Sequence, residues 1–191
     1  MVQCVNNVME KSRRVFIKQL AILGIGSQFF MYACNDKKMV VIPSSYTPMS
    51  EVQAKIIAYI LEILFPNEGN APSIQQLNTL EYVIWNLNDK KRDPESNEYI
   101  INGIDWVEET AIEEKQKTFL ELKDKDKTFI IEFISKKSWG EGWLSTILTL
   151  IFESLVYDPI YNINKEQVGW NWLKHKPGYP RPTEKIKYKA S

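Results

Sequence analysis

The sequence predicts an all-α protein, a small bundle of about five helices followed by an extended C-terminal arm (residues 157–182) with no further helix. Apolar residues recur at steps of three and four through most of residues 48–156. Residues 143–156 are apolar around most of a helix, which is typical of a helix in the middle of a bundle. The arm holds four of the nine prolines and two of the six tryptophans, so we expect it to lie over the helices by its rings.

Length and composition indicate one globular domain with a real core, since the chain has 191 residues, 44% of them hydrophobic. Both cysteines, Cys4 and Cys34, precede the helical region, which excludes thiolate metal sites and a disulfide scaffold there. Residues 1–33 carry four basic groups and one acid, leaving 20 basic and 23 acidic groups elsewhere. This balance argues against a nucleic-acid partner. We predict a signal peptide (1–33), a tether (34–47), a single helical domain (48–182) and a basic tail (183–191).

The first segment resembles a twin-arginine export signal. Residues 12–18 read Ser-Arg-Arg-Val-Phe-Ile-Lys, and a moderately apolar run follows over residues 20–33. A short transmembrane helix is the alternative, but the run contains glycine, serine and glutamine and is shorter than the roughly 20 apolar residues of a span. The residues that carry the signal are Arg13, Arg14, Phe16 and Lys18.

Cys34 stands where a lipoprotein signal places its modified cysteine, after Met31-Tyr32-Ala33. The alternative is an incidental thiol near an ordinary cleavage site. Lipidation would hold the mature chain on a membrane through acyl chains. In either case we expect export to the periplasm or cell envelope.

The first two predicted helices begin and end at clear signals. The first starts at Thr47-Pro48 and stops at Phe65-Pro66. Ser73 caps the second, whose apolar residues recur from Ile74 to Leu87. Residues 88–97 are charged and read as a solvated loop.

A third helix covers residues 98–117, and four of its glutamates, Glu108, Glu109, Glu113 and Glu114, form an acidic face. Without a histidine partner, and with lysines at 115 and 117, these acids indicate a water-facing surface rather than a metal site. Asp124 is expected to cap a fourth helix. That helix should turn inward Phe129, Ile130, Phe133 and Ile134.

The fifth helix ends at Asp158-Pro159, because proline lacks an amide donor and pushes the preceding residue out of the α region. Among the aromatic residues near this helix, we expect Trp143 and Tyr157 to fill the core. Arginine and aromatic residues are enriched at the energetic centres of protein interfaces. The predicted partner-binding residues are therefore Tyr161, Trp170, Trp172, Tyr179 and Arg181.

Three stretches are similar to the gluconate 2-dehydrogenase subunit 3 family: the helix ending at Phe65-Pro66, the Phe-Leu-x-Leu lead-in at residues 119–122, and the arm. The arm resembles the family in Asp158-Pro159-x-Tyr161, in Gly169-Trp170 and in its Pro-rich close. Asn162 and Ile163 stand where the family usually has two glycines, so this turn is expected to do without glycine conformations.

The resemblance implies a non-catalytic small subunit of a membrane-associated dehydrogenase in the cell envelope. Its partner would be a large flavoprotein of the glucose-methanol-choline type that contains FAD, often with a cytochrome c subunit. The small subunit would carry the export signal, engage the twin-arginine translocase, and escort and stabilise the folded flavoprotein. The chain itself shows no glycine-rich phosphate loop, no cysteine cluster and a single histidine, His175, so we expect no cofactor in it.

Two other readings stay open. The chain could be a free-standing, lipid-anchored module that binds another envelope protein. It could also be a hydrolase that works through carboxylates. The acids available for that chemistry are Glu108, Glu109, Glu113, Glu114 and Asp158.

Overall fold

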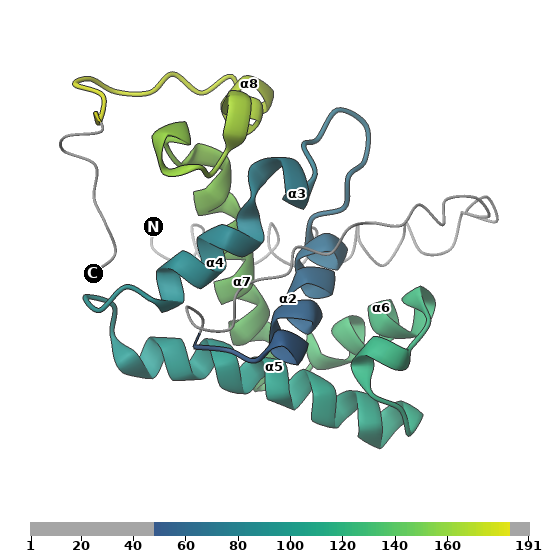
Figure 1. Cartoon of the computed structure of the whole chain (residues 1–191). Coiled ribbons are helices and arrows are strands. Elements are labelled where there is room, and N and C mark those ends of the chain that lie inside the picture. Colours follow the sequence, from purple (N-terminus) through teal and green to yellow (C-terminus); the bar gives the residue numbers. More distant parts are fainter. Residues whose placement is uncertain (1–47, 184–191) are drawn as a thin grey trace, which may run out of the picture. The chain divides into compact units, whose positions relative to one another are not determined.

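A computed structural model of the chain describes residues 48–183, and these residues form an all-α fold without strands (Figure 1). This confirms the predicted fold class. The α-helices are α2 (Glu51–Leu64), α3 (Ile74–Leu77), α4 (Thr79–Leu87), α5 (Pro94–Lys115), α6 (Asp124–Ile134), α7 (Ser138–Val156) and α8 (Val168–Leu173). Short 3-10 turns are η2 (Phe119–Glu121), η3 (Pro159–Tyr161) and η4 (Lys165–Gln167).

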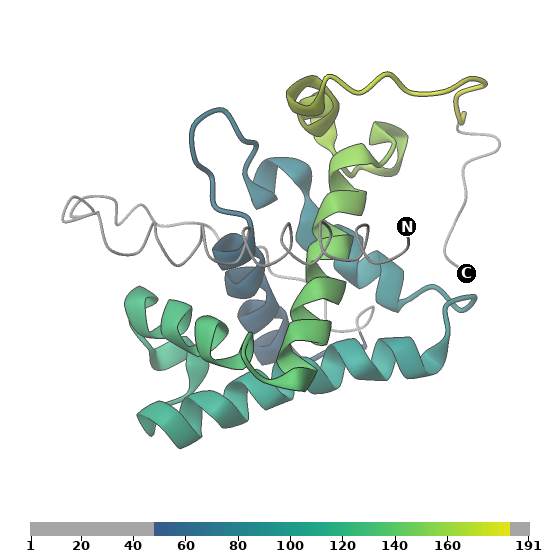
Figure 2. The same ribbon diagram turned by 180° about the vertical axis from the view of Figure 1, so that it is seen from behind.

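The longest helix, α5, lies across one end of the bundle, and α8 lies at the other end (Figures 1 and 2). Between them α2, α4 and α7 pack together, and α7 contacts all the other long helices. Their facing sides form one apolar core, which includes the fully buried Ile57, Ile60, Ile104, Ile147 and Ile151.

Trp143 is the largest fully buried side chain, and it joins α7 to α5. Its indole Nε1–H donates a hydrogen bond to the Ile100 carbonyl at 3.1 Å. A Cβ atom at Gly103 would lie only 1.9 Å from that indole nitrogen. The close contact of the two helices therefore requires glycine at this position, and the prediction that Trp143 belongs in the core is confirmed.

The segment predicted as one helix from Ser73 to Leu87 is two helices. Ser73 caps the first as expected, accepting a hydrogen bond from the Gln76 amide in a capping box. Asn78 then adopts left-handed backbone angles (φ 58°, ψ 38°), which ends α3 and starts α4 on a new axis. Asparagine tolerates this region better than most residues, but the apolar spacing gave no sign of the break.

Three helix starts differ from their predicted positions. The first helix begins at Glu51, with Ser50 as its N-cap, rather than at Thr47-Pro48. Helix α5 starts four residues earlier than predicted, because Asp93 caps it and Pro94 occupies its first turn. The fourth helix, α6, is preceded by Lys123 as N-cap, so Asp124 lies inside the first turn.

Some apolar side chains expected inside lie at the surface. Helix α7 buries most of its circumference, yet Phe152 and Val156 are 49% and 45% exposed. Phe129 on α6 is also exposed, with the Lys115 ammonium 4.2 Å from its ring centre. Within the described part of the chain, no helix has the length and apolarity needed to span a bilayer.

Candidate functional site

The position of the C-terminal arm depends on how helix α7 ends. After Val156 the chain leaves the helix, and the Asp158 carboxylate accepts a hydrogen bond from the Ile160 amide at 3.0 Å. This local bond fixes the turn η3. The arm is less extended than predicted, because η3, η4 and α8 follow, and only the segment after α8 (residues 174–183) lacks helical turns.

Asn164, which is fully buried, holds the middle of the arm in place. Its side chain accepts a hydrogen bond from the Gly169 amide at 2.7 Å and donates one to the Tyr157 carbonyl at 3.1 Å. Its backbone amide donates to the Leu77 carbonyl at 2.8 Å. One buried side chain thus joins the end of α7 to the start of α8, and its backbone ties both to α3.

The turn expected to do without glycine conformations adopts them all the same. Asn162, Asn164, Glu166 and Gln167 all have positive φ, at 66°, 49°, 56° and 59°. Asparagine adopts these backbone angles at little energetic cost, whereas Glu166 and Gln167 are more strained there. The turn therefore reaches left-handed backbone angles without glycine, and the Ile163 side chain is buried in the core.

Gly169 and Trp170 dock α8 on the end of α7. A Cβ atom at Gly169 would lie 2.3 Å from the Leu155 carbonyl oxygen, so only glycine allows this approach. Trp170 is 4% exposed, and its Nε1–H donates to the Val156 carbonyl at 2.9 Å. That bond satisfies a carbonyl that the helix end leaves without an intrahelical partner.

Arg181 closes the arm over this tryptophan. Its guanidinium lies 4.4 Å from the Trp170 ring centre, and its Nη2 lies 2.8 Å from an Asp158 carboxylate oxygen. The Nε–H donates to the same oxygen at 3.0 Å. We call Asp158, Trp170 and Arg181 the arm clamp. It returns the chain to the end of α7 and leaves residues 174–180 as a loop between two fixed points.

The structure therefore places the predicted partner-binding residues in three different settings. Tyr179 on the clamped loop is 87% exposed, and Trp172 on α8 is 40% exposed. Trp170 and Arg181 instead belong to the arm clamp, where burial of the indole limits what a partner could touch. Tyr161 is half-buried with its ring 5.3 Å from that of Tyr157.

Two neighbours of the exposed rings were not singled out in the sequence. Leu173, next to Trp172, is 44% exposed and adds apolar surface. Phe65 packs against Trp172, with ring centres 5.7 Å apart and an edge-to-face angle of 88°. In the sequence, Phe65-Pro66 indicated a helix end and a family resemblance, and nothing in its spacing predicted a contact with α8.

A second aromatic group lies where α4 meets the end of α7. The Tyr82 ring is 4.9 Å from Tyr157 and 6.1 Å from Trp85. The Tyr82 hydroxyl donates to the Glu153 carboxylate at 2.9 Å. Burial raises the pKa of Tyr82 far above its ordinary value, and the neighbouring Glu153 charge adds to this effect.

Among the described residues, the carboxylates that were candidates for hydrolysis do not lie together in one site. Glu108 accepts a hydrogen bond from the Phe119 amide at 2.8 Å, and Asp158 belongs to the arm clamp. Glu109, Glu113 and Glu114 are exposed on α5. Over residues 48–183, no three His, Cys, Asp or Glu side chains lie close enough together to hold a metal ion.

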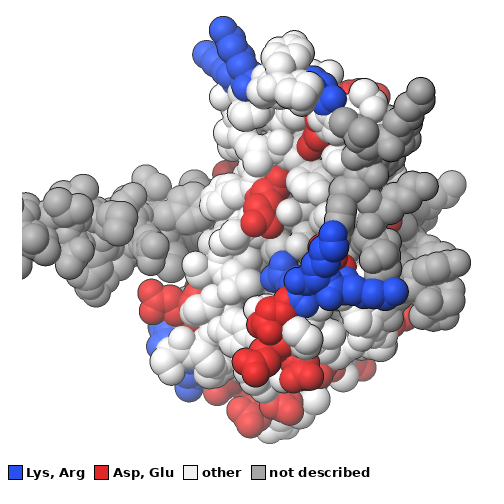
Figure 3. Space-filling view, turned by 90° about the vertical axis from the view of Figure 1, so that its left-hand side faces the viewer, with Lys and Arg blue, Asp and Glu red and all other residues white. Residues whose placement is uncertain are grey.

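Charge is mixed on the face of the molecule seen in Figure 3. Uncharged side chains cover most of this face. Its basic side chains in the middle and at the lower left lie beside acidic ones, whereas those at the upper left have only uncharged neighbours in this view. The predicted signal residues Arg13, Arg14, Phe16 and Lys18, the candidate lipidation site Cys34, the tether and the basic tail beyond residue 183 lie outside the described residues.

Comparison with known proteins gives one match. The sequence model of the family described as gluconate 2-dehydrogenase subunit 3 matches residues 51–178, more than half of the chain. No curated protein and no solved structure matches it. The matched region runs from the start of α2 to the loop that follows α8.

Proposed function

The chain belongs to the gluconate 2-dehydrogenase subunit 3 family, and from that premise we propose that it is the non-catalytic small subunit of an FAD-dependent dehydrogenase complex in the cell envelope. In this role it binds a large flavoprotein of the glucose-methanol-choline type and stabilises it. A cytochrome c subunit completes the complex and passes the electrons onward.

The observation that carries this proposal is the construction of the arm. A partner surface must be apolar enough to bind and ordered enough that binding costs little conformational entropy. Trp172 and Tyr179 are exposed, yet α8 is docked by Trp170 and the following loop is fixed by Arg181. Large rings held at the surface by a buried support are typical of interface anchors.

Export forms the second half of the proposal. Residues 12–18 address the chain to the twin-arginine translocase, which moves folded proteins, and a lipid on Cys34 holds the complex on the membrane afterwards. The small subunit then serves as the address for a flavoprotein that has already folded around FAD. The matching test replaces Arg13 and Arg14 by lysine, and we expect both subunits to remain in the cytoplasm.

Affinity purification from the native host tests the binding half. A tagged chain is expected to bring down a protein with the absorbance spectrum of bound flavin, identified by mass spectrometry. Tyr179→Ala and Trp172→Ala each should lower the recovered flavin about tenfold, since anchor residues contribute 1–3 kcal/mol or more.

Phe129→Ala is the matched control, because this ring is 41% exposed on α6, away from the arm (Figure 1). It should recover as much flavin as the unchanged chain. Recovery of a different, flavin-free envelope protein would favour the free-standing binding module instead. If all three variants lost the same amount of recovered flavin, the claim that the arm forms the interface would be wrong.

A further inference from the structure

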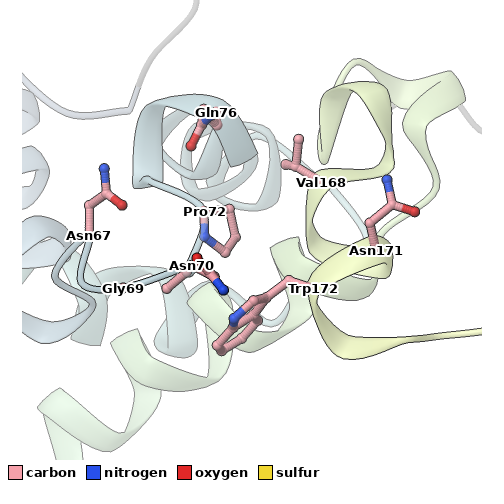
Figure 4. A pocket seen from close by; sticks show the side chains of 9 residues that line it. Asn67, Gly69, Asn70, Pro72, Gln76, Val168, Asn171 and Trp172 are labelled. Atoms are coloured by element: carbon pink, nitrogen blue, oxygen red, sulfur yellow. The ribbon is translucent and has the colours of Figure 1, made fainter.

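A groove lies between the loop that joins α2 to α3 and helix α8 (Figure 4). Its volume is about 590 Å³, within the range of small-molecule sites. Asn67 and Asn70 lie on the loop side, Asn171 lies on the α8 side, and Trp172 lies across from Gln76. We call this the amide groove.

The lining has an unusual chemistry. Of its nine residues four carry side-chain amides, one is tryptophan, and none is charged. An amide both donates and accepts hydrogen bonds, and so does a hydroxyl group. Within the described part of the chain, no hydrogen bond occupies the side-chain amides of Asn67 and Asn70. Gln76 uses only its oxygen, which accepts from the Ser73 amide at 2.8 Å.

From this lining we propose that the amide groove binds an uncharged carbohydrate, with Trp172 stacking on the apolar face of a sugar ring and the amides of Asn67, Asn70 and Asn171 bonding its hydroxyls. An anionic ligand would find no cation in the lining, and a purely apolar ligand would leave the side-chain amides of Asn67 and Asn70 without partners. The Asn171 side chain donates one long hydrogen bond, to the Glu166 carbonyl at 3.5 Å, and keeps its oxygen for a ligand hydroxyl. A sugar ring has an apolar C–H face and a hydroxyl edge, which match an indole face and a set of amides.

The walls are formed before any ligand arrives. Gly69 turns the loop with a φ of 60°, Pro72 is buried, and the Ser73–Gln76 capping box fixes the start of α3. On the other side, Phe65 supports the Trp172 ring edge-to-face. Binding therefore needs no rearrangement of the backbone walls, and its entropic cost is that of ordering the exposed amide side chains.

This inference stands apart from the proposed function, because it requires no partner subunit. Trp172 belongs to both the groove and the proposed partner surface, whereas the amide side chains belong to the groove alone. A failure of carbohydrate binding leaves the dehydrogenase subunit proposal untouched, and the reverse also holds.

The test is an NMR titration of the purified full-length chain with D-glucose and with maltohexaose, which separate a free sugar from a glycan chain. The indole N–H signal of Trp172 and the side-chain amide signals of Asn70 and Asn171 are followed. We expect saturable shifts confined to these signals, with millimolar affinity for whichever form binds. Sodium gluconate, the charged comparison ligand, should bind more weakly.

Variants test whether the sugar binds at the amide groove. Trp172→Ala and Asn70→Ala should each weaken binding about tenfold, whereas Asn102→Ala, an exposed amide on α5, should leave it unchanged. Asn70 is exposed in the loop, so its variant tests the groove even if loss of Trp172 disturbs Phe65. The proposal is overturned by absence of saturation up to about 100 mM sugar, by tighter binding of gluconate, or by unchanged affinity in Asn70→Ala.

Discussion

Replacing Arg181 by alanine should open the arm without unfolding the helical bundle. The change removes two short contacts to one Asp158 oxygen, at 2.8 and 3.0 Å, and the guanidinium packed on Trp170. The helices keep their own core, since Trp143, Ile147 and Ile151 belong to its buried cluster and the three residues of the arm clamp do not.

The size of the effect follows from the exposure of the pair. The Arg181 and Asp158 side chains are 31% and 17% exposed, so the ion pair is neither fully screened nor fully desolvated. We estimate about 1–2 kcal/mol for the charged hydrogen bonds and about 0.5–1 kcal/mol for the cation–π contact. A total near 2 kcal/mol corresponds to a roughly 30-fold rise in the open population of the arm.

Hydrogen exchange measures this opening directly. The His175 amide donates to the Trp170 carbonyl at 2.8 Å, so its exchange reports release of the segment after α8. We expect it to exchange roughly 30-fold faster in Arg181→Ala, with amides of α5 unaffected.

The control is Lys55→Ala, which removes an exposed ion pair with Glu51 on α2 and should change neither signal. In Asp158→Asn, a further Arg181→Ala change should cost only the share of the Trp170 contact, about 0.5–1 kcal/mol, because the charge pair is already lost. Unchanged His175 exchange in Arg181→Ala, or equal acceleration across α5, would refute the arm clamp as a local lock.

Three further predictions concern the bundle. Gly103→Ala places a Cβ 1.9 Å from the Trp143 indole and should cost about 3 kcal/mol or more, measured by urea unfolding, while Gly178→Ala, with open space around it, should be neutral. Ser73→Ala removes the α3 cap and should cost about 1 kcal/mol in the same assay. Because burial raises the pKa of Tyr82, the folded chain keeps that proton when the unfolded chain has lost it. The free energy of unfolding should therefore fall above about pH 10 by up to about 1.4 kcal/mol per pH unit, and Tyr82→Phe should remove that part of the slope.

Periodicity and capping chemistry were enough for the fold class and for most of the core. The run around Trp143 predicted a central helix, and Ser73 predicted a helix start, because each depends on residues near in sequence. The α3–α4 break was missed, since Asn78 departs from helical angles without altering the apolar spacing. The exposed Phe152 shows the same limit, because spacing cannot tell which apolar stripe receives a neighbour.

The arm could be predicted in composition but not in shape. Its tryptophans suggested a ring-rich surface, yet burial of Trp170 depends on Gly169 meeting Leu155 and on Arg181 returning to Asp158. The amide groove had no sequence signal, because Asn67 and Asn171 are brought together only by the fold. Contacts between residues so far apart in the chain become visible only once the helices are placed.

The claim that the arm binds a flavoprotein is tested most directly by a photo-crosslinking amino acid placed at Tyr179, which is 87% exposed, in the native host. We expect a crosslinked product that contains this chain and an FAD-binding dehydrogenase subunit, with no such product when the same group replaces Phe129. A dehydrogenase crosslinked from position 129 and not from position 179 would contradict it.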